Sequence, residues 1–161
     1  MNNYKLPKNF NLIHFEELDS TMLKLKELTL GGAKIGTIVL AKKQTQGRGR
    51  HGREWVSPVG NLYFSFLRKA EKDNSSKIFS PVFITSIALA KTILNFSSSI
   101  DVKLKWPNDV LINNSKVAGI LIESFKSNQK TKLLNIGVGI NIVSNPLDTL
   151  YPSTNLLKEG I

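Results

Sequence analysis

Residues 44–55 read QTQGRGRHGREW and place three glycines among three arginines and His51. Glycine lets a backbone approach a ligand closely, and arginine offers a planar fork of donors suited to carboxylate and phosphate. The spacing therefore predicts a loop that binds an anionic substrate. A loop that contacts nucleic acid and a merely solvated loop are the alternatives. The pattern G-x-x-x-x-G-K-[ST] is absent, so the segment is not a P-loop.

KWPND (105–109) is a second segment with chemically useful side chains, set between two apolar runs. Asn108 and Asp109 supply an amide and a carboxylate that could hold a metal ion or ribose hydroxyls. The spacing alone favours a simpler interpretation, in which Pro107 and Asn108 form an ordinary turn and Trp106 fills the core.

Two strand-like segments add a cation and small residues. KVAGILIES (116–124) begins with Lys116, and Gly119 is small enough to let a ligand come close. A lysine that leads a strand is more often simply exposed to solvent. GVGIN (137–141) has glycines in a strand interior and ends on Asn141, which could bind a ligand or form a turn.

The first half of the chain predicts elements that could position these groups. Short apolar runs predict strands at 11–15, 36–41 and 61–67, and the last alternates with Leu62, Phe64 and Phe66 on one face. Asp19 or Ser20 is placed to cap a helix at 22–30 that ends at Gly31 and Gly32. That helix would present Met22, Leu25 and either Leu28 or Leu30 on one face. Residues 69–77 predict an exposed loop, and 78–96 a long helix.

The second half is rich in strands. Apolar runs predict strands at 102–106, 109–113, 116–125 and 133–142. Asn113-Asn114-Ser115 predicts a hairpin turn, and 127–130 another turn. The tail from 143 to 161 has little periodicity. The fold class is therefore α+β, a mixed or antiparallel sheet with a few helices, and residues 1–161 form one domain.

Composition narrows the classes of function. The chain has 161 residues, no cysteine and two histidines, so disulfides, thiolate chemistry and a histidine-rich metal site are excluded. The net charge of +10 fits nucleic acid, a nucleotide or an anionic protein as partner, but much of it comes from scattered lysines typical of a solvated surface. The sequence shows neither a signal-peptide pattern nor a long apolar run, which predicts a cytoplasmic protein without a membrane partner.

Taken in order, these motifs resemble the catalytic domain of biotin–protein ligases. The matching stretches are LDSTM (18–22), QTQGRGRHGREW (44–55), SPVGNLYFSF (57–66), KWPNDVLI (105–112), KVAGILIES (116–124) and IGVGINI (136–142). The resemblance implies a seven-stranded, largely antiparallel mixed sheet flanked by helices, shared with lipoate ligases. It also implies a chain that lacks the family's small C-terminal β-barrel domain and any N-terminal helix-turn-helix, so a nucleic-acid partner is not expected. Met22 stands where the family often has asparagine.

The resemblance also implies roles for individual residues. The residues beside biotin would be Ser20, Thr21, Gln44, Gly47, Arg48, Lys116 and Gly119. Those on the nucleotide side would be Arg50, Arg53, Trp55, Asn108 and Asn141, with Trp55 near the adenine and Asp109 on the magnesium side. Lys116 and Arg48 would be the catalytic pair, with Arg48 in a loop that closes over the adenylate.

The implied reaction uses biotin, ATP and Mg²⁺. Biotin would be activated to biotinyl-5′-AMP and transferred to a lysine of a biotin carboxyl carrier protein. A homodimer formed through the sheet is compatible with the family. A lipoate or octanoate ligase or transferase of the same fold, and a basic nucleic-acid-binding module without enzymatic activity, are the alternative functions.

Overall fold

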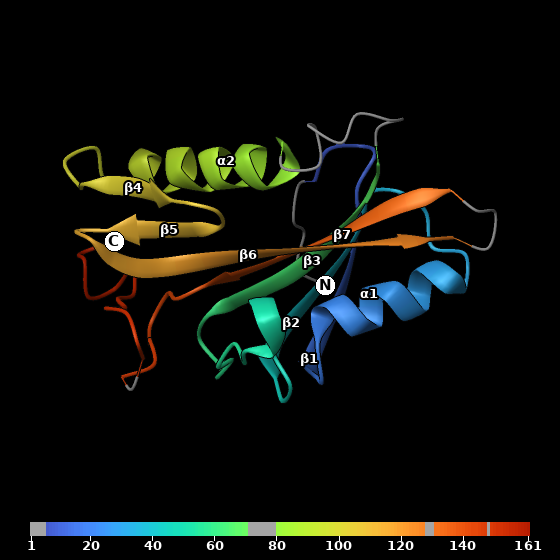
Figure 1. Cartoon of the computed structure of the whole chain (residues 1–161), viewed down its shortest axis with the longest axis horizontal. Helices are drawn as coiled ribbons and strands as arrows, with labels where there is room; N and C mark the ends of the chain where they lie inside the picture. Colours follow the sequence, from blue (N-terminus) through green and yellow to red (C-terminus); the bar gives the residue numbers. More distant parts are fainter. Residues whose placement is uncertain (1–5, 71–79, 128–130, 148) are drawn as a thin grey trace.

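The computed structural model describes residues 6–70, 80–127, 131–147 and 149–161 (Figure 1). The predicted loop at 69–77 and the predicted turn at 127–130 lie largely outside the described residues. Among the described residues, no helix is both long and apolar enough to cross a membrane.

Seven strands form one sheet that extends across the whole molecule. In spatial order they are β1 (Asn11–Leu18), β2 (Thr37–Gln44), β3 (Leu62–Lys69), β7 (Lys132–Ile140), β6 (Ser115–Lys126), β5 (Asp109–Ile112) and β4 (Val102–Lys105). β1 and β2 are parallel, and every other neighbouring pair is antiparallel. The predicted α+β class with a mixed, largely antiparallel sheet is confirmed.

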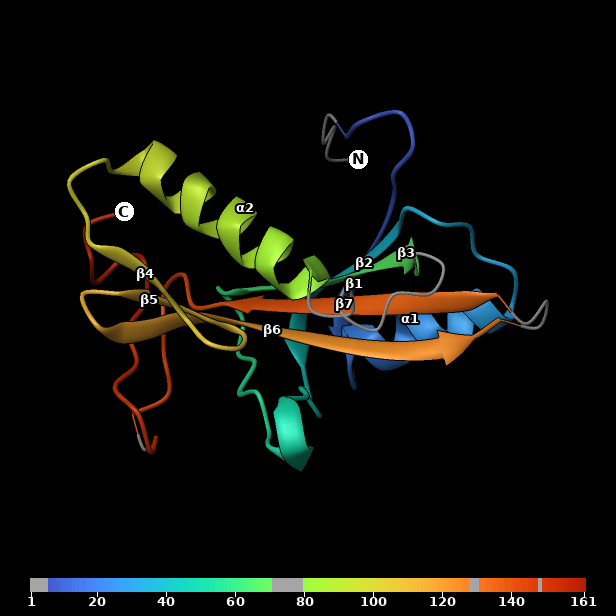
Figure 2. The same ribbon diagram turned by 45° about the horizontal axis from the view of Figure 1, so that its top comes forward.

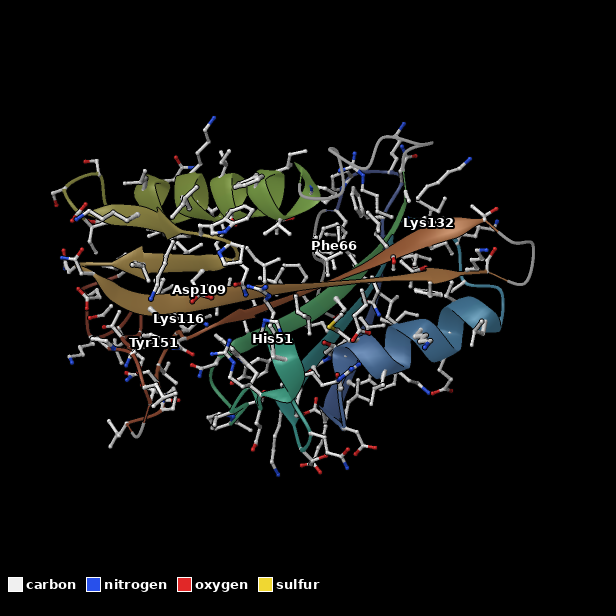
Figure 3. The ribbon with its side chains drawn as sticks, in the orientation of Figure 1. His51, Phe66, Asp109, Lys116, Lys132 and Tyr151 are labelled. Atoms are coloured by element: carbon white, nitrogen blue, oxygen red, sulfur yellow. The ribbon has the colours of Figure 1, made fainter. Side chains whose placement is uncertain are left out.

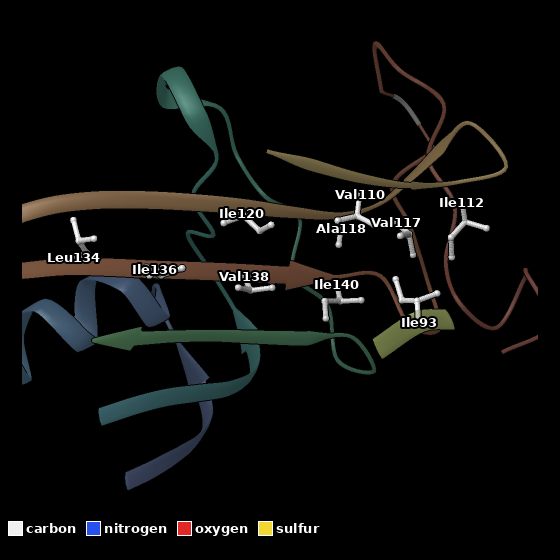
Figure 4. Close-up of a cluster of buried hydrophobic side chains, with 10 residues drawn as sticks. All are labelled: Ile93, Val110, Ile112, Val117, Ala118, Ile120, Leu134, Ile136, Val138 and Ile140. Carbon is white, nitrogen blue, oxygen red and sulfur yellow. The ribbon is translucent and has the colours of Figure 1, made fainter. Parts of the chain in front are cut away.

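Two helices cover opposite faces of this sheet, as Figure 2 shows. α2 (Ser80–Phe96) contributes Ile93 to the larger core, which is built on β5, β6 and β7 (Figure 4). α1 (Thr21–Leu30) lies on the other face, where Leu25 packs with Val39, Leu67 and Leu133. The basic loop that follows β2 lies on the α1 side.

The predicted apolar faces of α1 and β3 are confirmed, and the second face of β3 is buried as well. Leu28 packs into the core beside Leu25, whereas Leu30 is exposed. Leu62, Phe64 and Phe66 share the α2 side of β3. Tyr63, Ser65 and Leu67, on the opposite face of the strand, are buried too, because α1 and the site described below cover that side. A central strand covered on both faces has no solvent side.

Three boundaries differ from the sequence prediction in ways that matter for the site. β2 continues from Ala41 to Gln44, so Gln44 lies at a strand end rather than in a loop. β4 ends at Lys105, before the cis peptide bond between Trp106 and Pro107. β7 ends at Ile140, which leaves Asn141 at the start of the tail.

The helix cap differs from its predicted form. Ser20 occupies the cap position of α1 with an extended backbone, but its side chain makes no capping bond. The side chain of Gln44, at the end of β2, accepts the bond from the Thr21 N–H at 2.8 Å instead. The start of the helix is thereby attached to the sheet.

Asparagine residues fix one hairpin turn and the start of the tail. Asn113 and Asn114 both have positive φ, 48° and 63°, which is what a tight hairpin between β5 and β6 requires, so this prediction is confirmed. The tail begins with a clamp at Asn61, whose side-chain oxygen accepts the N–H groups of Ile142, Val143 and Ser144. This clamp fixes the direction in which the tail leaves the sheet.

Candidate functional site

A cavity of about 380 Å³ opens on the α1 side of the sheet, between α1, the basic loop and the tail. Asp109, Lys116 and Tyr151, which line it, are labelled in Figure 3. Its volume is within the range of small-molecule sites. It brings together every residue predicted for the site except Gly47, namely Ser20, Thr21, Gln44, Arg48, Arg50, Arg53, Trp55, Asn108, Asp109, Lys116, Gly119 and Asn141. These residues come from segments far apart in sequence, and the sheet makes them neighbours.

Glycines on β6 and β7 form the floor of the cavity. A Cβ added to Gly139 would lie 2.4 Å from Nε1 of Trp55, and one added to Gly119 would lie 2.8 Å from its ring. A Cβ at Gly137 would lie 2.7 Å from the sulfur of Met22. Only glycine leaves the space in which Trp55 and Met22 pack against the strands.

A β-bulge places the side chain of Lys116 in the cavity. The β5–β6 register shifts between Val110, which pairs with Ala118, and Leu111, which pairs with Lys116. Val117 and Ala118 are therefore consecutive residues that both pack into the α2 core. Without this extra residue, Lys116 and Gly119 would lie on opposite faces, because side chains alternate along a strand. With it, both face the cavity.

Lys116 has two partners there. Its amine lies 2.7 Å from a carboxylate oxygen of Asp109 and 5.2 Å from the ring centre of Trp55. Both side chains of the ion pair are largely buried, so solvent screens this pair less than a surface one. The predicted metal residue Asp109 thus binds a cation of the protein itself. Among the described residues, no group of three or more His, Asp or Glu side chains is arranged to hold a metal ion.

The other end of the cavity is a network of neutral polar groups. The Thr21 hydroxyl lies 3.1 Å from the Gln44 side-chain oxygen and 2.8 Å from the Ser65 hydroxyl. The Gln44 amide donates to Ser57 at 2.9 Å. Ser20 is buried beside them. We refer to this as the head end, because it suits the polar ring of a ligand, and to the end with Lys116 and Asp109 as the lysine end.

The basic loop folds into a small hairpin over the cavity. Trp55 N–H donates to the Gly47 carbonyl at 2.9 Å, and Gly49 N–H donates to the Arg53 carbonyl at 2.7 Å. His51 and Gly52 turn the tip with φ of 56° and 73°. Gly47 is enclosed, since a Cβ there would lie 2.2 Å from the Trp55 carbonyl oxygen. Its role is to let the two sides of the hairpin meet.

Two arginines attach this hairpin to the far side of the cavity. Arg48 forms a two-pronged ion pair with Glu123 of β6, at 2.8 and 3.2 Å. Arg50 donates to the Asn108 side-chain oxygen at 3.2 Å. Arg53 bonds within the loop, to the Arg50 carbonyl at 3.3 Å. The hairpin therefore bridges β2 and β3 to β5 and β6, above the glycine floor.

Arg48 and Lys116 line the same cavity but have different partners in it. Glu123, which holds Arg48, pairs across the sheet with Asn135, and the Asn135 amide donates to the Met22 carbonyl. Arg48 is therefore held at the head end, whereas Lys116 is held by Asp109 at the other end. Arg50, through Asn108, is at the lysine end.

Three predicted site residues also make contacts that stabilise the fold around the cavity. The Asn108 amide donates to the Ile120 carbonyl at 2.9 Å, and the Asn141 amide donates to the Thr154 carbonyl at 3.0 Å. Asn141 is 3% exposed, so its side chain holds the tail more than it offers atoms to a ligand. Trp55 covers the glycine floor between the two ends. Its buried Nε1–H has no hydrogen-bond partner in the described part of the chain.

The tail supplies a wall that the sequence did not predict. Residues Pro146, Thr149, Leu150, Tyr151 and Ser153 line the lysine end. Lys116 N–H donates to the Pro152 carbonyl at 2.8 Å, and Thr154 N–H donates to the Lys116 carbonyl at 2.9 Å, so the tail runs beside the start of β6. The prolines and weak periodicity of this segment gave no signal for a wall. The sequence NPLDTLYPS does contain an aromatic residue, Tyr151, which was the available clue.

Comparisons with known proteins agree with this arrangement. A model described as the biotin/lipoate A/B protein ligase family matches residues 14–141. The bifunctional ligase/repressor BirA of Bacillus subtilis (strain 168) is 36% identical over 86% of this chain and 42% of its own length. The biotin–[acetyl-CoA-carboxylase] ligase of Paracoccus denitrificans is 38% identical over 67% of this chain and 45% of its own length. The chain thus spans less than half the length of these relatives.

A solved structure shares the fold. Biotin protein ligase from Aquifex aeolicus in complex with biotin and ATP superposes with a TM-score of 0.78 at 35% identity, over 92% of this chain and 60% of that chain. The resemblance seen in the motifs is therefore confirmed both along the sequence and in three dimensions. The chain belongs to the biotin/lipoate A/B protein ligase family.

Proposed function

We propose that this cavity joins biotin to ATP, forming biotinyl-5′-AMP, and that the biotinyl group then passes to a lysine of a biotin carboxyl carrier protein. The observation that carries the proposal is one cavity with a polar end, where Arg48 and Glu123 offset each other's charge, and a cationic end, separated by an apolar floor. Biotin has the same three parts, namely a polar ureido ring, an aliphatic chain and a carboxylate.

The head end suits the biotin ring. Ser20, Thr21 and Gln44 offer hydroxyl and amide groups to the ureido edge, while Met22 offers a thioether to the sulfur ring. Lipoate and octanoate have no polar ring group. They would leave these buried polar groups unmatched, and an unmatched buried polar group is costly. The head end therefore favours biotin over the substrates of the sister enzymes.

The lysine end suits the chemistry of activation. A biotin carboxylate oxygen attacks the α-phosphorus of ATP, a new P–O bond forms, and the bond to the β-phosphate breaks to release pyrophosphate. Fixed cations offset the repulsion between the two anions and stabilise the charge that develops. Lys116 and Arg50 supply that charge, with Arg53 nearby on the cavity wall. No enzyme nucleophile is needed, because the carboxylate itself attacks.

Mg²⁺ would arrive on the phosphates as part of the nucleotide substrate. A nucleotide-bound Mg²⁺ commonly takes one or two protein carboxylates. Asp109 holds Lys116 through Oδ1, so its other oxygen could serve the metal ion while Lys116 turns to the phosphate. The two roles assigned to this pair are therefore compatible.

The mixed anhydride must be kept from water, which is the role we propose for the hairpin over the floor. Arg48 would leave Glu123 to reach the adenylate, since the resting ion pair keeps it at the head end. In transfer, the amine of the carrier lysine attacks the anhydride carbonyl and AMP leaves. That amine must first lose a proton, against a reference pKa of about 10.4. The cytoplasmic location and the sheet-mediated homodimer stay predictions of the sequence.

Calorimetric titrations separate the candidate functions. The wild-type chain should bind biotin, and binding of lipoate should be weaker by at least about tenfold because the head end is left unmatched. Preferred binding of lipoate would move the protein to the sister activity. If biotin does not bind and a nucleic-acid duplex does, with a steep dependence on salt, the non-enzymatic alternative holds.

A further inference from the structure

Lys105, the last residue of the edge strand β4, lies beside the lysine end of the cavity. Its amine is 4.2 Å from the ring centre of Tyr151, which lines the cavity and is 52% exposed. Among the described residues, Lys105 forms no ion pair with a carboxylate. Lys103, two residues earlier on the same strand, pairs with Asp101 at 2.8 Å. Lys105 thus brings a positive charge to the rim that no described carboxylate neutralises.

The order of groups along the cavity indicates which part of the nucleotide would lie beside Lys105. The head end lies toward Glu123, and β6 then leads through Gly119 to Lys116. Tyr151 comes next, since the Pro152 carbonyl beside it accepts the Lys116 N–H. In an in-line displacement, the leaving group departs on the side opposite the attacking oxygen. If biotin attacks from the head end, pyrophosphate must leave toward Tyr151 and Lys105.

We propose that Lys105 is a further substrate-binding residue, which binds the β- and γ-phosphates of ATP and the pyrophosphate that leaves. This inference rests on the proposed function. The Tyr151 ring holds the lysine stem and amine at the rim by a cation–π contact, which is weak enough to yield to a phosphate. Asp109 is the nearby carboxylate that could compete for the amine, but Lys116 already occupies it.

The charges around Lys105 suit a polyphosphate ligand better than a ligand with a single negative charge. Lys105 and Lys116 approach the lysine end from β4 and β6, and Arg50 reaches Asn108 between them. Asp109 is the carboxylate beside these cations, and it already pairs with Lys116. A triphosphate, with several negative charges in a row, matches a row of cations better than biotin's single carboxylate does.

Binding of inorganic pyrophosphate tests the proposal without requiring turnover. Titrations of pyrophosphate, Mg-ATP and biotin would be compared for wild type, Lys105→Met, Lys105→Arg and the control Lys103→Met. Lys105→Met keeps the apolar stem over Tyr151 and removes the charge. Its affinity for pyrophosphate and ATP should fall by about tenfold, the worth of a charge-assisted hydrogen bond, with biotin affinity unchanged. Lys105→Arg and Lys103→Met should resemble wild type.

The salt dependence distinguishes a phosphate contact from a merely structural role. If Lys105 contacts phosphate, Lys105→Met should weaken the dependence of pyrophosphate affinity on salt, whereas displacement of the Tyr151 ring would not. Wild-type affinity and salt dependence in Lys105→Met would overturn the inference, as would an equal loss in Lys103→Met. A wild-type chain that binds biotin but not pyrophosphate would overturn it too, and leave the biotin site standing. Failure of biotin itself to bind would reject the proposed function instead.

Discussion

Lys116 is the side chain on which the proposed chemistry depends most directly. A bulge aims it into the cavity, and Asp109 holds it there at 2.7 Å. Replacing it with methionine keeps most of the volume and removes the charge that stabilises the attacked phosphate. We expect Lys116→Met to slow adenylate formation by about 10²- to 10³-fold, the usual cost of losing one such donor.

Release of pyrophosphate with biotin and Mg-ATP measures that loss. Lys42→Met is the matched control, because Lys42 is an exposed lysine that pairs with Glu16 and does not line the cavity. It should keep wild-type rates. Equal rates for Lys116→Met and wild type would remove Lys116 from the mechanism.

Tyr63 makes a prediction about alkaline stability. Burial raises its pKa from 10.0 to about 12. A group whose pKa is higher in the folded state contributes its full stability below the unfolded pKa, and loses it as the pH rises through the folded value. Between pH 10 and 12, the free energy of unfolding should therefore fall more steeply for wild type than for Tyr63→Phe.

Denaturant unfolding at several pH values tests this difference, and contributions common to the two proteins cancel in the comparison. At neutral pH, Tyr63→Phe should be less stable by about 1 kcal/mol, because it loses the bond to the Pro58 carbonyl. Parallel alkaline curves for the two proteins would mean that the phenol is not protected by burial.

The types of most site residues could be read from the sequence, but their partners could not. Ser20, Thr21, Gln44 and Lys116 were predicted by a resemblance between motifs, and the cavity does contain them. The pairing of Arg48 with Glu123 was not predictable. It joins residues 75 positions apart, and each could as well have faced solvent. Tyr151 was missed because a segment rich in prolines gives no periodicity that would predict its side.

At the scale of elements, the glycines of β7 make the floor on which Trp55 lies. Gly139→Ala would put a methyl group 2.4 Å from Trp55 Nε1, so the indole must move. We expect the tryptophan emission to shift to the red and biotin affinity to fall at least tenfold, while overpacking costs about 1–3 kcal/mol of stability.

Gly31→Ala is the matched control. Gly31 has φ of −79° at the end of α1, and a Cβ there makes only ordinary contacts. It should leave emission and biotin affinity unchanged. Wild-type affinity in Gly139→Ala would show that Trp55 and the floor are not part of the ligand site.

The hairpin at residues 47–55 predicts a measurable resting state. Glu123→Gln removes the ion pair to Arg48, and a partly exposed pair contributes about 0.2–1 kcal/mol. Exchange of the Gly49, Arg53 and Trp55 amides should therefore speed up about 1.5- to 5-fold in the ligand-free protein. Glu17→Gln, which removes an exposed pair to Lys43, should leave these amides unchanged.

Ligand binding gives the complementary result. With biotin and Mg-ATP bound, the hairpin amides should become more protected in both wild type and Glu123→Gln, because Arg48 then has the adenylate. Protection that does not change when ligand is added would contradict closure of the loop.

The elements themselves were largely predictable, because hydrophobic period and turn residues are local. The resemblance implied a seven-stranded mixed sheet, but apart from the hairpin at Asn113 and Asn114 the order of its strands was not predicted, because periodicity does not show which strands pair. The bulge at Val117 was not predictable, since KVAGIL shows an unbroken apolar run with no mark of the extra residue. The long-range pairing that selects the bulge is a property of the folded sheet.

For the whole molecule, the cations behind the net charge of +10 lie in two kinds of place, on the exposed surface and at the lysine end of the cavity. Several lysines are in exposed ion pairs, including Lys24 with Glu27, Lys42 with Glu16 and Lys43 with Glu17. The cations at the lysine end face the cavity. Biotin affinity should therefore change less than about twofold between 50 and 500 mM salt, while ATP affinity falls, since screening acts most on the polyanion. Calorimetry at the two salt concentrations measures both.

A steep loss of biotin affinity with salt would mean that scattered surface charge, rather than the neutral head end, dominates binding. An unchanged ATP affinity would mean that the cations at the lysine end do not meet the nucleotide.

Formation of the adenylate tests the central claim most directly. The purified chain would be incubated with Mg-ATP and either biotin or lipoate, and the products identified by mass spectrometry. We predict biotinyl-5′-AMP from biotin and little adenylate from lipoate, because the head end matches only the polar ring. Adenylate from lipoate in preference to biotin, or no adenylate from a chain that binds both biotin and ATP, would contradict the account.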